Sequence, residues 1–144
     1  MTQRRQTLGR NGESQAARFL EARGYRIVDR NVRVDRVEID VIVSRGDLVA
    51  FVEVKSRRAW GTRDAPRHTN AAEAVDQRKQ ARIRRGAAQW LRLHPRLRAR
   101  AGRIRFDVVT CLLIEGDREM DPPNETTAPD EPARWSIEHW EAAF

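Results

Sequence analysis

The stretch that decides the fold is VEIDVIVSRGDLVAFVEVKSR, residues 37–57. It holds two runs rich in β-branched and other apolar residues, 37–45 and 48–57, on either side of the dipeptide Gly46-Asp47. Glycine followed by aspartate between two such runs is typical of a two-residue hairpin turn. The stretch therefore predicts two antiparallel strands joined by a tight turn.

The turn also fixes which residues face each other. With Gly46 and Asp47 as the two turn residues, Asp40 lies directly opposite Glu53 on the same face of the hairpin. The Cβ atoms of directly opposed residues are about 4.5–5.5 Å apart, so two carboxylates placed there repel each other. A divalent cation between them would turn this repulsion into a binding site, and Mg²⁺ or Mn²⁺ suits such hard oxygen ligands.

Lys55 lies two residues beyond Glu53 and therefore points to the same face. In a metal site its ammonium would orient an attacking water or neutralise charge that develops on a phosphate. The alternative is that Lys55 forms ordinary ion pairs with Glu38 and Glu53 on a solvated face, each worth little. Apolar residues share the predicted face, namely Ile42, Val49 and Phe51. Charges on a partly covered face need a partner, which favours the metal site.

Further elements are predicted before the hairpin. A helix is expected over residues 11–23, with Asn11 as its N-cap and Gly24 at its end, after a flexible segment 1–8. A first strand is expected over residues 25–33.

The chain after the hairpin predicts a loop over 58–70, a long helix over 71–93 closed by Pro95, and an apolar strand over 104–114. The acidic, proline-rich segment 116–134 predicts a disordered insertion, and 135–140 a last strand or short helix. The order α-β-β-β-α-β predicts an α/β fold in a single domain over 1–144, with a mixed central sheet flanked by helices.

The charge of the chain favours a polyanionic partner. The 144 residues carry a net charge of +7, although residues 115–133 contain seven acids and a single arginine. A basic surplus on the rest of the chain favours nucleic acid, with the alternative that it only keeps the protein soluble. Of 28 basic residues, only Lys55 and Lys79 are lysines, which marks them as positions where an arginine does not serve.

The remaining composition points to a reducing cytoplasm. Cys111, the only cysteine, sits in an apolar run and is expected to be buried rather than cross-linked. No apolar run is long enough to span a bilayer, and the polar N-terminus is not a secretory signal.

Several basic residues are candidates for binding nucleic acid. Lys79 lies between Val75 and Ile83 on the apolar stripe of the long helix, so it points toward the sheet. There it would contact a phosphate or a site carboxylate, or else cover apolar surface with its methylene chain. Further candidates for phosphate contacts are Arg57, Arg78 and Arg82, and a merely solvated face is the alternative for the helix arginines.

Asp107 lies inside an apolar strand, where an unpaired charge is costly. It predicts a structural ion pair with Arg105 or with an arginine of a helix. His68, His94 and His139 have no ligand spacing with one another or with Cys111, which argues against a structural zinc site.

The chain also carries an ordered set of short motifs: Gly12-Glu13, Gly24-Tyr25, Asn31-Val32-Arg33, Glu38-Ile39-Asp40, Phe51 to Arg57, Ala74-Val75, Lys79, Arg105 to Val109 and Ala143-Phe144. This set resembles the YraN-like family, a bacterial group assigned to the restriction-endonuclease-like superfamily with its PD-(D/E)XK motif. The resemblance covers nearly the whole chain outside the acidic segment. Val37 departs from the family's usual glycine, which bears on the geometry of the strand and removes no acid.

The resemblance implies a restriction-endonuclease-like core, similar to that of archaeal Holliday-junction resolvases. In the superfamily pattern Asp40 and Glu53 hold the metal, the Val54 carbonyl assists, and Lys55 is the catalytic lysine. Glu13, on the first helix, completes the acidic cluster.

Together these observations predict an endonuclease that hydrolyses DNA phosphodiesters with Mg²⁺ or Mn²⁺, with branched or structured DNA among its candidate substrates. A paired cut of both strands would require a homodimer. One alternative is a module of the same fold that binds nucleic acid without cutting it. Another is an interaction protein whose acidic segment recruits a basic partner.

Overall fold

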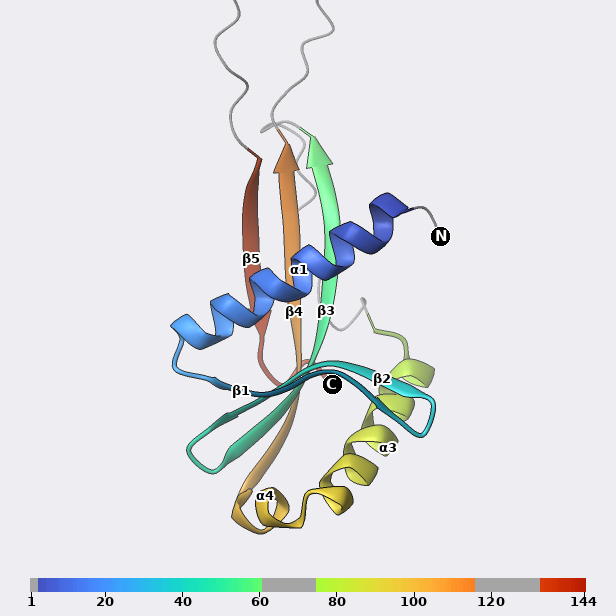
Figure 1. The fold of residues 1–144 in the computed structure, drawn as a ribbon, viewed down its shortest axis with the longest axis vertical. Helices are drawn as coiled ribbons and strands as arrows, with labels where there is room; N and C mark the ends of the chain where they lie inside the picture. The colour runs from blue at the N-terminus through green and yellow to red at the C-terminus, as the bar shows by residue number, and fades with distance from the viewer. Residues whose placement is uncertain (1–2, 61–74, 116–132) are drawn as a thin grey trace, which may run out of the picture.

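The computed structural model describes residues 3–60, 75–115 and 133–144 and contains one five-stranded sheet flanked by helices (Figure 1). Its elements are α1 (Gln3–Ala22), β1 (Arg26–Val34), β2 (Val37–Arg45), β3 (Leu48–Trp60), α3 (Gln77–Leu93), α4 (Pro95–Arg100), β4 (Arg103–Glu115) and β5 (Arg134–Trp140). The strands lie in chain order, β3 and β4 are parallel, and the other neighbours are antiparallel. The predicted α/β fold with a mixed central sheet is confirmed.

Several predicted boundaries were wrong. Helix α1 begins at Gln3 rather than at residue 11, so it includes most of the segment expected to be flexible. Strand β3 continues through residues 58–60, which were expected to start a loop. The chain after Pro95 forms the short helix α4, because proline is tolerated in the first turn of a helix. The rest of the predicted loop, residues 61–70, and residues 116–132 of the acidic segment lie outside the described residues.

Helix α3 also begins later than predicted, at Gln77 instead of residue 71. Its N-cap is Asp76, whose side-chain Oδ1 accepts a hydrogen bond of 2.8 Å from the backbone N–H of Lys79. An aspartate in this position satisfies one of the free N–H groups in the first helical turn. The cap therefore fixes where α3 starts and where Lys79 lies in it. Residues 71–74 are outside the described part of the chain.

The predicted hairpin register is confirmed from Arg45–Leu48 to Val41–Val52, and Gly46 in the turn has φ +60°. The ladder between β2 and β3 ends there. Beyond it β3 stays paired with β4 along its whole length, while β2 stays paired with β1 as far as Val34–Val37. Figure 1 shows the β1–β2 pair turning away from the upper half of β3. We call this divergence the fork; Asp40 and Glu53 lie at its base, and their expected cross-strand pairing is absent from the ladder.

The two long helices pack on opposite faces of the sheet. The core under α1 includes Ala16, Leu20, Val41, Val43, Ala50 and Val52. The core under α3 includes Ile39, Ile42, Val49, Phe51, Ala87 and Trp90. The predicted covered face with Ile42, Val49 and Phe51 is therefore the α3 face. Ile39 and Val41 belong to different cores although they are two residues apart, so the alternation of β2 is interrupted at Asp40.

Two glycines allow the helices to approach the sheet closely. A Cβ on Gly12 of α1 would overlap the side-chain oxygen of Ser56 on β3. On the other face, a Cβ on Gly86 of α3 would come within 2.9 Å of Val37 Cγ1. Val37 thus packs directly against a helix glycine. Among the described helices, none has both the length and the apolar character needed to cross a membrane.

We expect Gly12→Ala to lower the free energy of unfolding by about 1–3 kcal/mol, because the new methyl group must push α1 away from Ser56. Gly9→Ala is the matched control, since nothing lies within 4 Å of a Cβ at that position of the same helix. It should raise stability by about 0.5–1 kcal/mol through helix propensity alone. Urea unfolding of both variants measures this, and equal effects would contradict the close approach at Gly12.

Candidate active site

The centre of the site is the Glu53 carboxylate on the α3 face of β3. Its side chain is only 5% exposed. Its Oε1 contacts the ammonium group of Lys55 at 3.2 Å and also that of Lys79. The only two lysines of the sequence therefore meet at one buried carboxylate.

The two lysines reach Glu53 from different elements. Lys55 follows it by two residues on β3, so the alternation of the strand places both side chains on one face. Lys79 comes from the first turn of α3, and Ile83, one turn further along, is buried in a core with Val108 of β4. The docking of α3 on the sheet therefore directs Lys79 toward the carboxylate, as its place on the helix stripe predicted.

Asp40 lies at the fork, beside Glu53. Its Oδ2 accepts a hydrogen bond of 2.8 Å from the backbone N–H of Val54. The pKa of Asp40 is raised from 3.8 to about 7, first by burial and then by the negative charge of Glu53, against the lowering effect of the Val54 hydrogen bond. The charge of Glu53 thus disfavours the charged form of Asp40, although the two residues are not paired across the ladder as the hairpin register predicted.

Glu13 joins this group from helix α1. Burial raises its pKa, a side-chain hydrogen bond with Asn31 opposes the rise, and the charges of Glu38 and Glu53 add to it. The charge of Glu13 also raises the pKa of Asp40. The structure therefore brings three acids from α1, β2 and β3 close enough for their charges to interact. We call Glu13, Asp40, Glu53, Lys55 and Lys79 the acid–lysine cluster.

In the described parts of the chain, no group of three or more His, Cys, Asp or Glu side chains is placed to hold a metal ion together. Glu53 is instead paired with the two lysines. For Lys79, burial would lower the pKa, but the hydrogen bond and charge of Glu53 outweigh burial and raise it. Lys79 is thus held as a cation against Glu53.

The three predicted arginines come from the same two elements as the lysines. Arg57, Arg78 and Arg82 are exposed, the first on β3 and the other two on α3. The pKa of Asp76 is lowered mainly by the backbone hydrogen bond from Lys79 and further by the charges of Arg82 and Arg78. The helical turn that directs Lys79 inward thus presents two arginines to solvent.

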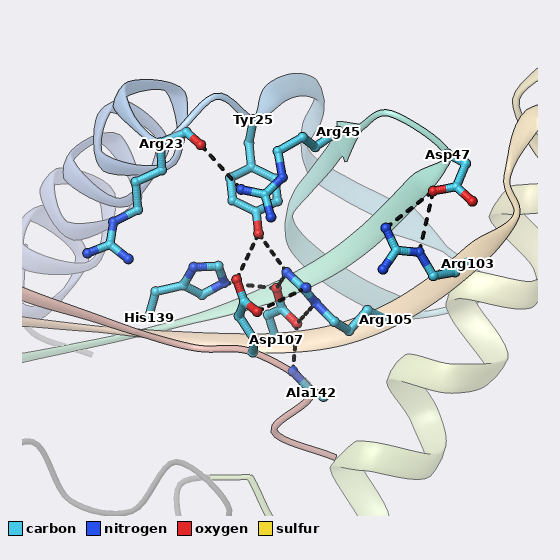
Figure 2. Close-up of polar contacts among 10 residues, drawn as sticks. Arg23, Tyr25, Arg45, Asp47, Arg103, Arg105, Asp107, His139 and Ala142 are labelled. Atoms are coloured by element: carbon cyan, nitrogen blue, oxygen red, sulfur yellow. Dashed lines mark hydrogen bonds and ion pairs between the residues drawn. The ribbon is translucent and has the colours of Figure 1, made fainter.

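A second charged group is centred on Asp107 and lies on the opposite, α1 face of the sheet (Figure 2). Asp107 is fully buried and accepts two hydrogen bonds of 2.8 Å from Arg105, one to each oxygen. It also accepts the Ala142 N–H at 3.0 Å and lies 2.8 Å from His139 Nε2. The predicted structural ion pair with Arg105 is confirmed.

The network extends beyond what the sequence indicated. Arg105 donates to the hydroxyl of Tyr25 at 2.7 Å, and this hydroxyl donates to Glu141 at 3.0 Å. Burial would raise the pKa of Asp107, but hydrogen bonds with His139 and Arg105 outweigh it and lower the pKa. His139 and Glu141 come from β5 and the chain after it, and no local pattern in the sequence links them to Tyr25. This network holds β4, the C-terminal chain and Tyr25, just before β1, together.

The fold and the cluster define an α/β protein with a partly buried acid–lysine cluster at the fork of a mixed sheet. The chain belongs to the Uncharacterised protein family UPF0102, whose model matches residues 12–111. This is the YraN-like family that the motifs resemble.

Relatives from several bacterial groups are similar over most of the chain. A UPF0102 protein of Rhodococcus opacus is 44% identical over 76% of this chain and 85% of its own length. One of Frankia casuarinae is 48% identical over 71% of this chain and 79% of its own length. One of Chlorobaculum tepidum is 38% identical over 96% of this chain and 92% of its own length.

We expect Asp107→Asn to lower the free energy of unfolding by about 3 kcal/mol, because it removes the negative charge that faces the buried end of Arg105. Asp47→Asn is the control: its ion pair with Arg103 is exposed, with side chains 57% and 67% accessible. That variant should lose less than about 1 kcal/mol. Urea unfolding at neutral pH compares the two, and equal losses would contradict a structural role for the Asp107 network.

Asp40 should make stability depend on pH in the metal-free protein. Its pKa is about 7 in the fold and 3.8 when unperturbed, so the fold favours the neutral acid. The stability that this group contributes is present below pH 3.8 and is lost as pH rises through 7. Between pH 5 and pH 8 we expect Asp40→Asn to gain about 2 kcal/mol relative to the unchanged protein.

Urea unfolding in EDTA at several pH values measures this gain. Asp47→Asn, in the exposed hairpin turn at the other end of β3, is the control and should follow the unchanged protein. A constant difference between Asp40→Asn and the unchanged protein across this range would contradict the burial of a repelled carboxylate at the fork.

Proposed function

We propose that this protein is a metal-dependent nuclease of the PD-(D/E)XK type that hydrolyses DNA phosphodiesters. The observation that carries the proposal is the arrangement at the fork. Glu53 and Lys55 are two residues apart on β3, and Asp40 of β2 binds the backbone between them at Val54. The order of acid, acid and lysine along two adjacent strands is the order that this superfamily uses.

The donor set suits a hard divalent cation. The negative charge of Glu53 raises the pKa of the neighbouring Asp40, and a bound cation would relieve that repulsion. The backbone N–H and C=O of a strand residue point to the same edge. Because the Val54 N–H points at Asp40, we assign the Val54 carbonyl to the ion as well. Mg²⁺ and Mn²⁺ prefer such oxygen ligands and, when bound, would polarise a phosphate and a water molecule.

The chain's own cations would bind the substrate. The Lys55 side chain is 30% exposed, so its ammonium reaches both Glu53 and the solvent from which a phosphate arrives. There it would neutralise charge that develops on the phosphate during attack by water. Arg57, Arg78 and Arg82 would contact neighbouring backbone phosphates, and the net charge of +7 would favour DNA from a distance. Glu13 would add a third carboxylate at the edge of the site.

A second candidate function is a module that binds DNA without cutting it. It is favoured by the pairing of Glu53 with two lysines and by the lack of a three-ligand group among the described residues. Such a module would bind DNA in a salt-dependent way. Its affinity would be unchanged in Asp40→Asn, or raised because one repulsion with phosphate is removed.

We expect the protein to cleave labelled duplex, flap, junction or single-stranded DNA in Mg²⁺ or Mn²⁺ and to be inactive in EDTA. Asp40→Asn and Lys55→Ala should each lower the rate at least about 100-fold. Asp47→Asn, at the hairpin turn at the other end of β3, should keep the rate of the unchanged protein.

Absence of cleavage on all four DNAs, or equal cleavage by all variants, would contradict the nuclease. Tight binding without cleavage, with Asp40→Asn binding at least as well, would support the module.

A further inference from the structure

The two lysines of the cluster are related to Glu53 in different ways. Lys55 is fixed to the same strand, two residues away, while Lys79 approaches across the interface between α3 and the sheet. The Lys79 side chain is 34% exposed, whereas Glu53 is 5% exposed. Lys79 therefore connects a buried carboxylate to the solvent along one flexible side chain.

The backbone of Lys79 is held firmly, although its side chain is long. Its N–H is bound by the capping Asp76, and the turn that follows is packed through Ile83 against β4. A lysine side chain keeps several rotatable bonds and a compact charge at its end. The ammonium of Lys79 is thus able to leave Glu53 without any movement of α3.

A lysine ammonium and a divalent cation compete for the same carboxylate. Both are attracted to the negative charge of Glu53, and at close range they repel each other strongly because the site is partly buried. A cation that enters between Asp40 and Glu53 must therefore weaken the contact between Glu53 and Lys79.

We propose that Lys79 is a built-in counter-ion that occupies Glu53 in the metal-free protein and is displaced when a divalent cation binds. This inference rests on the proposed function and concerns the regulation of the same site. The displaced ammonium turns to the solvent side, where it pairs with a phosphate of the substrate. Separation of Lys79 from Glu53 lowers the free energy gained when the cation binds, and the new contact between Lys79 and a substrate phosphate offsets part of this loss. Metal and DNA therefore each favour the binding of the other.

The identity of the residue supports this role. The chain uses arginine at 26 of its 28 basic positions, yet lysine at both positions that touch Glu53. An arginine in place of Lys79 would bind the carboxylate through a planar, two-pronged contact that holds more tightly. Lysine therefore suits a counter-ion that a divalent cation must displace, because it binds the carboxylate less tightly than arginine would.

The test is isothermal titration of Mn²⁺ into the full chain, without DNA. Lys79→Met removes the charge and keeps length and helix propensity, so we expect it to bind Mn²⁺ about five- to tenfold more tightly than the unchanged protein. Lys79→Arg should bind Mn²⁺ equally or more weakly. Arg78→Met removes an exposed charge from the same turn and should change the affinity by less than about twofold.

The outcomes separate the inference from the function on which it rests. Unchanged or weaker Mn²⁺ binding by Lys79→Met, with binding intact in the unchanged protein, overturns the counter-ion while the nuclease stands. If Lys79→Met does not fold, as judged by circular dichroism, the Lys79→Arg variant decides: binding tighter than in the unchanged protein overturns the inference. An unchanged protein that binds no Mn²⁺ contradicts the metal site itself.

Discussion

The hydrogen bond from the Val54 N–H to the Asp40 carboxylate is the constraint on which the site depends. A backbone N–H of a central strand is normally bound by the carbonyl of its neighbour, and here a side chain replaces that carbonyl. The Asp40 carboxylate accepts the Val54 N–H at the point where β2 separates from β3. Strand β2 can therefore follow β1 away from β3 without leaving this donor unpaired. The fork, and the access of α1 and α3 to its base, follow from this exchange.

The two faces of the sheet handle buried acids in opposite ways. Asp107 is fully buried and bound by a planar guanidinium, a histidine and a backbone N–H, an arrangement that leaves it no freedom. Glu53 is almost as buried but is held by two flexible ammonium groups, each about one-third exposed. The first arrangement suits a fixed joint between β1, β4 and β5. The second keeps a buried charge neutralised while leaving the partners free to move, which is what a binding site requires.

The hairpin could be predicted because its turn chemistry and its alternation of side chains are local, and together they fix the register. The position of Lys79 was predictable for the same reason, since a helix stripe shows which side chains face the sheet. The fork could not be predicted, because it depends on the twist of the whole sheet and on a carboxylate that competes with a backbone acceptor. Arg105 was predictable as a partner of Asp107 because it lies two residues away on the same strand. The other partners, His139 and the Ala142 N–H, could not be predicted, because their segment meets β4 only in the folded chain. Asp76 is a typical N-cap residue and could have predicted the start of α3. It was missed because the apolar Val75 before it fits the helical stripe and extended the predicted helix toward the N-terminus.

The acid–lysine cluster also lowers the stability of the fold. Three carboxylates share a partly buried space with two lysines, and burial together with the charge of Glu53 raises the pKa of Asp40 against the lowering effect of Lys79. Replacement of the cluster by apolar residues would remove this conflict, because buried charges seldom stabilise a fold as well as good packing does. The unfavourable charge interactions lie at the fork, whereas Asp107 on the other face has its hydrogen bonds satisfied. This pattern is expected when residues are kept for binding a ligand rather than for stability. We therefore base the proposed cation on the three acids of the cluster, and the proposed polyanionic substrate on the exposed arginines of β3 and α3.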